Sequence, residues 1–467
     1  MTPPAGSAGR FAAAILAAIS LAAATRPGQP APAVLRRIAI FGSSVASGTG
    51  DESGREGYAG ILRDLLQPRG WEIVNQSRGG DNTAKLMSRF DPEGKPEPGT
   101  RYLVPARAGY VVVGLSLGNE GIRDVEGAAA KDARFDQYVR GIQAVVARSR
   151  AAGMIPVVTL CYTRNDFTEV EYGYTRRMNA LINQWDVPSV NLLGAVDDGA
   201  GKWATGFWWD SLHPNAAGHA ELATTFVPSL FDALERGKPM PTRAKAGGYA
   251  RLSPAAALTF SPDSAMHPFA LAARVRASGD GPVATISGSL LDASTGTKTV
   301  TRPGQAPITI DSTALTPGAA TSAAIGIRRG LWTYTSTSGT VVASSVRADA
   351  GWHDLLVSHY TARGESLFFV DGVLAGRAAE RYAPGKFVVG GPGLTRRIDI
   401  KDVLLYRSAL NPDEAAALAK GTLLQASLEI YAPLTDATMR RGAPIENRAQ
   451  SLSALVLEAG AATHLGR

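Results

Sequence analysis

From residue 37 to about residue 236, short apolar runs alternate with segments whose apolar residues recur at helical spacing. Strands that alternate with helices pair in parallel, and a parallel sheet covered on both faces accounts for runs that are apolar throughout. We therefore expect an α/β domain of three layers, α/β/α, with a sheet of about five strands. The expected strands are Ile38 to Phe41, Glu72 to Asn75, Tyr110 to Leu115, Ile155 to Cys161 and Ser189 to Leu193.

The segments between these runs predict the helices that cover the sheet. Within residues 131–153, Phe135, Tyr138 and Ile142 recur at helical spacing, and Gly153 follows as a stop signal. The other expected helices are Tyr58 to Leu66, Tyr174 to Trp185 and Ala216 to Leu234.

Length, charge and cysteine content limit the class of protein. A chain of 467 residues exceeds one ordinary core, so we expect two domains. The formal charge of +7 is modest, and the Lys and Arg residues are scattered among acids, which argues against a nucleic-acid partner. Cys161 is the single cysteine, so no internal disulfide can form, and its apolar run predicts a core residue rather than a nucleophile.

The second half of the chain has a different pattern. A linker rich in Pro, Gly and Lys, residues 237–248, precedes a region where helical periodicity nearly disappears. Alternating apolar residues with Ser, Thr and Gly predict a β-sandwich over residues 249–467, and Asp371 with Gly372 predicts a tight hairpin turn. The expected strands include Phe269 to Arg276, Val283 to Ser287, Trp332 to Thr335, Leu355 to Thr361, Leu367 to Val370, Phe387 to Gly390 and Ile398 to Tyr406.

The amino-terminal segment has the pattern of an export signal. Arg10 precedes an apolar run, Phe11 to Ala24, which is too short to span a bilayer and ends in small residues suited to cleavage. We expect residues 1–24 to be a signal peptide and residues 25–36 a linker, with no stable membrane span. The protein is then periplasmic or extracellular, and an uncleaved anchor is the alternative.

The first apolar run ends in the stretch "FGSSVASGTGD", Phe41 to Asp51. Gly and Ser make turns, which is the ordinary explanation for this composition. However, α/β folds place their chemistry at the carboxyl ends of strands, where Ser44 would hold a hydroxyl. A serine nucleophile needs a base, a group that orients the base, and donors for the oxyanion.

The candidate base is a histidine near the end of the first domain. His213 lies in "WWDSLHPNAAGH" with Asp210 three residues upstream, a spacing at which the carboxylate reaches imidazole Nδ1 while Nε2 faces the site. The alternative is that Asn215 caps the last helix and that Asp210 and His213 are ordinary polar loop residues. His219 lies inside that helix, where we expect a surface or packing role.

Two further loops supply candidate donors for an oxyanion. Gly80, in "NQSRGGDNT", has an amide that no side chain obstructs, and Asn119, in "GLSLGNEG", carries a side-chain amide. Both sequences are also common in turns. Four loops at the carboxyl ends of strands together favour a catalytic site.

Residues 37–236 resemble an SGNH hydrolase of the GDSL-type esterase superfamily. The four sequence blocks of that family are present in order, at Gly42 to Ser44, Gly80, Asn119, and Asp210 to His213. The resemblance implies a flavodoxin-like fold and a serine hydrolase that acts on esters without metal or cofactor.

The resemblance also implies a role for each residue. Ser44 is the nucleophile, His213 takes its proton, and Asp210 orients His213. The oxyanion is held by the backbone amides of Ser44 and Gly80 and by the side chain of Asn119.

The sequence departs from the family pattern at two positions. Ser43 stands where the family usually has Asp, and Glu120 stands where Asp is common. Neither position carries a proton in the implied mechanism. Ser43 leaves open a shift of the nucleophile by one residue, and Glu120 leaves open a change in its loop.

The second domain resembles the concanavalin A-like or laminin-G-like jelly rolls found on exported enzymes. The resemblance rests on "GWHDLLVSHYTARGESLFFVDG" and "RRIDIKDVLLYRSALNPDEAAAL", in which Asn411 and Pro412 start a short helix. Such domains often bind sugars, sometimes with calcium, and no ligand residue is assigned here. Trp332, Tyr334 and Trp352 are expected in the core rather than on a sugar-binding surface.

Two classes of function remain open. The first is an exported serine esterase acting on an acylated carbohydrate or another ester, with a carbohydrate acetylesterase favoured over a lipase. Its sandwich would bind a polysaccharide or brace the enzyme. The second is a non-catalytic carbohydrate-binding or adhesion protein with a degenerate hydrolase domain, which Ser43 would permit.

Overall fold

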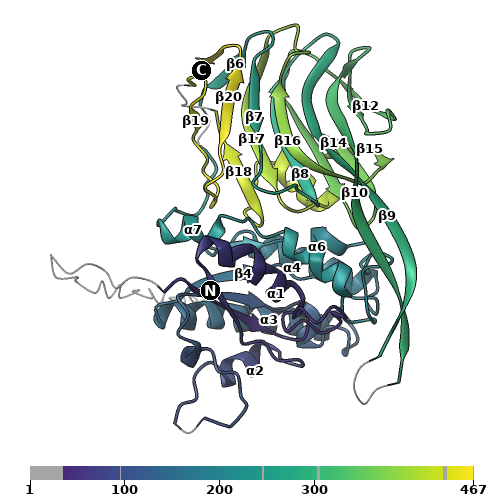
Figure 1. The fold of residues 1–467 in the computed structure, drawn as a ribbon. Helices are drawn as coiled ribbons and strands as arrows, with labels where there is room; N and C mark the ends of the chain where they lie inside the picture. The colour runs from purple at the N-terminus through teal and green to yellow at the C-terminus, as the bar shows by residue number, and fades with distance from the viewer. Residues whose placement is uncertain (1–34, 95, 245–246, 302–305, 435–438, 466–467) are drawn as a thin grey trace, which may run out of the picture. The chain divides into compact units, whose positions relative to one another are not determined.

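The computed structural model describes residues 35–94, 96–244, 247–301, 306–434 and 439–465 (Figure 1). The predicted signal peptide, residues 1–24, lies outside the described residues. A five-stranded parallel α/β fold is followed by two antiparallel sheets that form a sandwich, which confirms the predicted fold class. No helix of the described residues is long and apolar enough to cross a membrane.

The parallel sheet has the strand order β2-β1-β3-β4-β5, the flavodoxin-like order. Gly42 pairs with Gly114, so the first and third strands end side by side and their following loops open at the same edge. The strands are β1 (Arg37–Gly42), β2 (Glu72–Asn75), β3 (Tyr110–Gly114), β4 (Ile155–Thr159) and β5 (Ser189–Val190).

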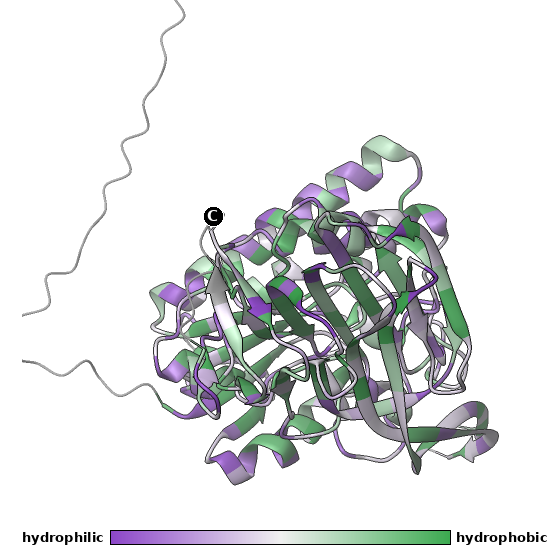
Figure 2. Cartoon of the chain, turned by 90° about the horizontal axis from the view of Figure 1, so that it is seen from above, coloured by the Kyte–Doolittle hydropathy of each residue, from purple (hydrophilic) through white to green (hydrophobic). Residues whose placement is uncertain are grey.

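Helices cover both faces of this sheet because alternate residues of each strand point to opposite sides. Ile38 and Ile40 belong to one apolar cluster, together with residues of α1 and α6, and Ala39 and Phe41 belong to another, together with residues of α3. Hydrophobic and hydrophilic residues alternate along the helices visible at the edges of the view in Figure 2. The helices are α1 (Gly57–Leu66), α2 (Thr83–Ser88), α3 (Ala128–Ala151), α4 (Glu169–Ile182), α5 (Leu193–Val196), α6 (Ala216–Thr224) and α7 (Leu230–Glu235).

Two expected elements differ from the structure at their ends. The single helix expected from Ala216 to Leu234 is two helices, because Pro228 lacks an N–H donor and disfavours helix in the residue before it. The fifth strand, expected to run to Leu193, is only two residues long because Leu193 begins α5.

The sandwich consists of the sheets β12-β11-β10-β9-β16-β7-β20-β19 and β15-β14-β13-β8-β17-β6-β21, with β18 paired to β17. Trp332 and Tyr334 are fully buried in its core, as expected, whereas Trp352 is half-buried. Its elements are β6 (Tyr249–Leu252), β7 (Ala257–Phe260), β8 (Phe269–Arg276), β9 (Gly281–Val300), β10 (Ile308–Arg328), β11 (Leu331–Thr335), β12 (Val341–Arg347), β13 (His353–Tyr360), β14 (Glu365–Val370), β15 (Val373–Ala379), β16 (Tyr382–Gly390), β17 (Ile398–Tyr406), α8 (Pro412–Ala419), β18 (Leu428–Ala432), β19 (Pro444–Ile445), β20 (Leu455–Ala459) and β21 (Ala462–Leu465).

Strands β9 and β10 are far longer than the strand expected at Val283 to Ser287. Pairing of β9 with β16 ends at Leu290, but β9 and β10 continue to pair with each other as far as Val300 and Ile308. We call this two-stranded extension, residues 291–300 and 308–317, the arm (Figure 1). Its Ser, Thr, Gly and Ala residues lack the alternation of large apolar side chains that would have predicted strands.

The sandwich covers the open edge of the parallel sheet. The backbone N–H of Ser427 donates to the carbonyl of Ser189 (3.1 Å), and the N–H of Asn191 donates to Ser427 Oγ (2.8 Å). Ala426 is buried in the apolar cluster that contains α3. An uncovered edge strand is free to pair with other chains, so this contact completes the α/β fold.

Candidate active site

A cavity of about 430 Å³ opens at the carboxyl end of the parallel sheet. Four of the five predicted site residues line it, each from a different loop: Ser44, Gly80, Asn119 and His213. The fifth, Asp210, lies beside His213. The four loops singled out in the sequence therefore meet at one place.

Asp210 and His213 form a pair within the loop of residues 206–215. Nδ1 of His213 lies 2.9 Å from both carboxylate oxygens of Asp210, and Oδ1 also accepts the backbone N–H of Leu212 at 2.8 Å. Burial opposes ionisation of Asp210, but the hydrogen bonds from His213 and Leu212 hold its pKa below the ordinary value. With Nδ1 engaged, Nε2 of His213 is the nitrogen left for chemistry.

Asn215 caps the following helix at the same time. Its Oδ1 accepts the N–H of Gly218 at 2.9 Å, and its side chain is fully buried. The helix-cap alternative and the Asp210–His213 pair are thus both present. The cap fixes the end of the loop that carries the pair.

Ser44 lies two residues after Gly42, the last residue of β1, and the close packing at position 42 requires glycine. A Cβ at Gly42 would lie 2.1 Å from the carbonyl oxygen of Gly114. The carbonyl of Ser44 accepts the N–H of Thr49 (2.9 Å) and the hydroxyl of Ser47 (2.8 Å), which hold the turn. Among the described residues, no hydrogen bond joins the Ser44 hydroxyl to His213, a contact that often forms fully only in complexes with substrate.

The two neighbouring serines have different surroundings. Ser43 is completely buried, and its Oγ has no hydrogen-bond partner among the described residues. Ser44 is half-buried and lines the cavity. The accessible hydroxyl is therefore that of Ser44.

The three residues predicted to hold an oxyanion, Ser44, Gly80 and Asn119, all line the cavity. Asn119 Oδ1 accepts the backbone N–H of Ser116 at 2.9 Å, which orients the amide and leaves Nδ2 to donate. Gly80 has a φ of 79° and open space around its Cα, so its amide can approach a ligand. Within the described part of the chain, the backbone amides of Ser44 and Gly80 donate no hydrogen bond.

Glu120 stabilises the loop that carries Gly80. The side chain is buried, and its two oxygens accept the N–H of Thr83 (2.8 Å) and Nε2 of Gln137 (3.0 Å). The departure from the family pattern at this position thus provides a tie between the Gly80 and Asn119 loops. A shorter carboxylate would reach less far.

Sequence reasoning missed a buried ion pair beneath the site, Arg89 with Asp81. Arg89 also donates to the carbonyls of Gly42 (3.3 Å) and Gln76 (2.6 Å). It therefore links the end of β1 to the Gly80 loop. No pattern around "MSRFD" distinguishes this arginine from a surface residue.

His219 lies behind the loop that follows β1 and carries Ser44, and it is completely buried. Its Nδ1 accepts the N–H of Tyr58 (3.3 Å), and its Nε2 donates to the carbonyl of Thr49 (3.0 Å). Burial lowers its pKa to about 4, so the ring is neutral near neutral pH. Both nitrogens are occupied, which fits a packing role.

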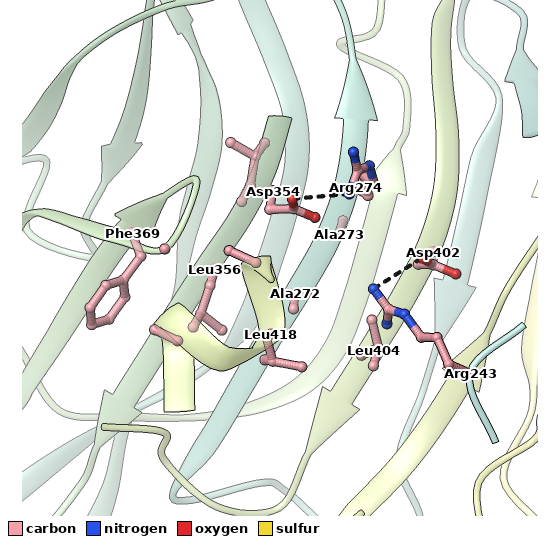
Figure 3. Close-up of a pocket in the computed structure, with 14 residues that line it drawn as sticks. Arg243, Ala272, Ala273, Arg274, Asp354, Leu356, Phe369, Asp402, Leu404 and Leu418 are labelled. Carbon is pink, nitrogen blue, oxygen red and sulfur yellow. Dashed lines mark hydrogen bonds and ion pairs between the residues drawn. The ribbon is translucent and has the colours of Figure 1, made fainter. Parts of the chain in front are cut away.

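A second cluster of charged groups lies on the sandwich (Figure 3). Arg274 pairs with Asp354 (3.3 Å) and Arg243 with Asp402 (3.6 Å) beside a cavity of about 30 Å³, which has room for little more than one water. Burial raises the pKa of Asp354 to about 6. Among the described residues no group of three or more His, Cys, Asp or Glu could hold a metal ion.

Comparison with known proteins finds a family match within the α/β part of the chain. Residues 40–221 match the GDSL-like Lipase/Acylhydrolase family. No curated protein matches the chain. Similar solved structures include a psychrotrophic esterase, EstA, from Pseudoalteromonas sp., at 17% identity, covering 43% of this chain and 98% of that chain with a TM-score of 0.31.

Two further solved structures cover a similar share of the chain. An acetylxylan esterase, Axe2, from Geobacillus stearothermophilus is 16% identical over 40% of this chain and 90% of its own, with a TM-score of 0.30. A GDSL-like lipase from Bacteroides thetaiotaomicron is 13% identical over 43% of this chain and 88% of its own, with a TM-score of 0.30.

Proposed function

We propose that this chain, in which residues 40–221 are an SGNH/GDSL hydrolase domain, is an exported serine esterase. The observation that carries the proposal is the Asp210–His213 pair, whose histidine lines the same cavity as Ser44. A non-catalytic binding protein would have no need to keep an ionised carboxylate on the ring nitrogen that faces away from the cavity.

In the proposed mechanism, Ser44 Oγ attacks the ester carbonyl while Nε2 of His213 takes the hydroxyl proton. Asp210 stabilises the charged ring, and the oxyanion accepts hydrogen bonds from the amides of Ser44 and Gly80 and from Nδ2 of Asn119. The C–O bond to the alcohol then breaks, and His213 returns the proton to the leaving oxygen. Water repeats the cycle on the acyl-enzyme and releases the acid.

The cavity favours a short acyl group. Leu212 is the one aliphatic side chain among its described lining residues, and most of the others are polar or glycine. A long lipid chain would meet only this one aliphatic side chain, whereas an acetyl group needs none. We therefore favour an acetylated carbohydrate over a lipid as the substrate.

A fluorophosphonate probe tests the esterase assignment, because only an activated serine reacts with it. We expect one labelled site, at Ser44. Acetate release from a panel of acetylated polysaccharides, compared with hydrolysis of long-chain aryl esters, then identifies the substrate class. A folded chain that fails to label would support the alternative of a carbohydrate-binding or adhesion protein.

Export and the role of the sandwich are part of the same proposal. The apolar run Phe11 to Ala24 supports a cleaved signal peptide and a periplasmic or extracellular enzyme. Sequencing the amino terminus of the mature protein tests this. Binding of a polysaccharide by the jelly-roll-like sandwich is tested by measuring retention of the full chain on an insoluble polymer.

A further inference from the structure

The arm of the sandwich contacts the loop that carries the Asp210–His213 pair. The N–H of Thr313, on β10, donates to the carbonyl of Gly206 at 3.0 Å. The carbonyl of Asp311, two residues earlier, accepts Nδ2 of Asn215 at 3.1 Å. These two contacts join the arm to the first and last residues of the loop 206–215.

The same two residues close the loop on itself. Nδ2 of Asn215 also donates to the carbonyl of Gly206 at 2.9 Å, and the N–H of Asn215 donates to the carbonyl of Phe207 at 3.3 Å. The arm therefore binds at the base of the loop, where its two ends meet. Asp210 and His213 lie between these ends.

The contact restricts which residue can stand at position 206. Gly206 has a φ of 82°, and a Cβ there would lie 2.0 Å from Oγ1 of Thr313. Oγ1 of Thr313 is itself held by Oγ1 of Thr295 on the other strand of the arm, at 2.8 Å. Leu315 of the arm packs on the apolar cluster that includes Phe207.

The arm also reaches the segment that follows the nucleophile. Nζ of Lys298 lies 3.5 Å from Oε1 of Glu52, whose side chain is almost completely buried. The other oxygen of Glu52 accepts the N–H of Ala216, the first residue of α6, at 2.7 Å. One arm thus contacts both the Ser44 side and the His213 side of the site.

We propose that the arm, through Asp311 and Thr313, is a positioning element that sets the distance between His213 and Ser44. This inference rests on the proposed esterase function. No arm residue is among the described residues that line the catalytic cavity, so the arm acts through the loop 206–215 and not on the substrate. A displacement of about 1 Å at a catalytic group costs about 100-fold in rate.

The test compares two arm deletions with opposite expectations. The first removes residues 293–315 and joins Asp292 to Thr316, which are direct cross-strand partners, through an Asn-Gly turn. The control removes residues 299–309 and joins Lys298 to Ile310, which are also direct partners, through the same Asn-Gly turn. It keeps every contact between the arm and the α/β fold that is named above.

We expect the long deletion to lower kcat and the rate of fluorophosphonate labelling together by about 10- to 100-fold, with KM nearly unchanged. The control deletion should behave as the unmodified chain. A long deletion that keeps kcat and the labelling rate, or that lowers only the melting temperature, would overturn the proposal.

A point variant removes the contact between the arm and the loop while the arm stays in place. Asn215→Asp keeps the Oδ acceptor that caps α6 but replaces the Nδ2 donor, so it loses the bonds to Gly206 and Asp311. We expect kcat to fall about 10-fold, and to fall less when the same change is made in the long deletion, because one bond is already absent there. Equal effects in both backgrounds would contradict a role for the arm.

Hydrogen exchange gives a readout without catalysis. In the long deletion, the amides of residues 206–215 should exchange faster, while those of α3 stay unchanged. If the unmodified chain fails to label but the exchange effect is present, the esterase proposal fails and the arm contact stands. If the chain labels and exchange is unaltered, only the arm proposal fails.

Discussion

Nδ1 of His213 lies 2.9 Å from both carboxylate oxygens of Asp210, three residues earlier in the same loop. Because the pair is local, its geometry depends little on the rest of the fold. The position of the pair relative to Ser44 is different, since Ser44 stands on another loop, at the end of β1. The experiments below therefore separate the chemistry of each residue from its placement.

Ser44→Ala should lower kcat by about 10⁴- to 10⁶-fold, because the nucleophile is lost. Ser43→Ala is the matched control, and it should keep most of the activity because the Ser43 hydroxyl is buried and makes no hydrogen bond among the described residues. Steady-state kinetics on an aryl acetate measures both. Reversed results would move the nucleophile to Ser43.

Substitution of His213 should affect activity, whereas substitution of His219 should affect stability. His213→Ala should abolish fluorophosphonate labelling while changing the melting temperature little. His219→Ala should keep labelling but lower the free energy of unfolding by about 1–3 kcal/mol, since it leaves the carbonyl of Thr49 and the N–H of Tyr58 without their buried partner. Loss of labelling in both variants at a temperature where both are folded would contradict this division.

Asn119→Asp tests the oxyanion assignment with little change in shape. The carboxylate can still accept the N–H of Ser116, but it cannot donate to the oxyanion and places a negative charge beside it. We expect kcat of Asn119→Asp to fall by about 10²- to 10³-fold, and kcat of Asn119→Ala to fall in the same range. Unchanged rates in both variants would assign the donor to another group.

Glu414 predicts a pH dependence of stability. Burial raises its pKa to about 8, against the opposing hydrogen bond from the Asn411 N–H, and the nearby Asp197 raises it further. Because the pKa is raised in the folded state, Glu414 contributes fully to the free energy of unfolding below about pH 4.5, the ordinary pKa of Glu. This contribution is lost as the pH rises through 8. Between pH 5 and pH 8, the melting temperature of the unmodified chain should therefore fall relative to that of Glu414→Gln, because glutamine does not titrate. A constant difference across this range would argue against a raised pKa.

A chain that ends at Arg243 tests whether the sandwich tethers a polymer or braces the enzyme. Such a chain lacks Ser427, which covers the edge strand, and the arm, so we expect aggregation or a lower melting temperature. Activity on a soluble aryl acetate and on an insoluble acetylated polysaccharide should fall together. Selective loss on the polymer, with an unchanged melting curve, would instead support tethering.

The elements that could be predicted from the sequence are those whose signal is local. The apolar runs before Gly42 and Leu115 predict β1 and β3, because a strand buried on both faces needs apolar residues throughout. Asn411 with Pro412 predicts the start of α8, where the structure has a capping box with Glu414. Ser44, Gly80 and Asn119 could be named because each lies in a loop that follows a strand, and His213 could be named because Asp210 stands three residues before it.

The features that could not be predicted depend on contacts between distant segments. The sequence of β9 and β10 beyond the sandwich lacks the alternation of apolar residues that would predict paired strands. The bonds of Thr313 and Asp311 to the loop 206–215 use backbone groups that every non-proline residue possesses. Arg89 is similarly hidden, because its partners at Gly42 and Gln76 are carbonyls.

The covered edge of the parallel sheet has a consequence for the order in which the protein matures. Asn191 and Ser427 are separated by 236 residues, so the catalytic fold leaves the ribosome long before the segment that seals its last strand. Until that segment arrives, the edge at β5 is exposed and can pair with a neighbouring nascent chain. Completion of the α/β fold is therefore tied to synthesis of the segment around Ser427, and a partner that holds the chain unfolded until then would protect the edge.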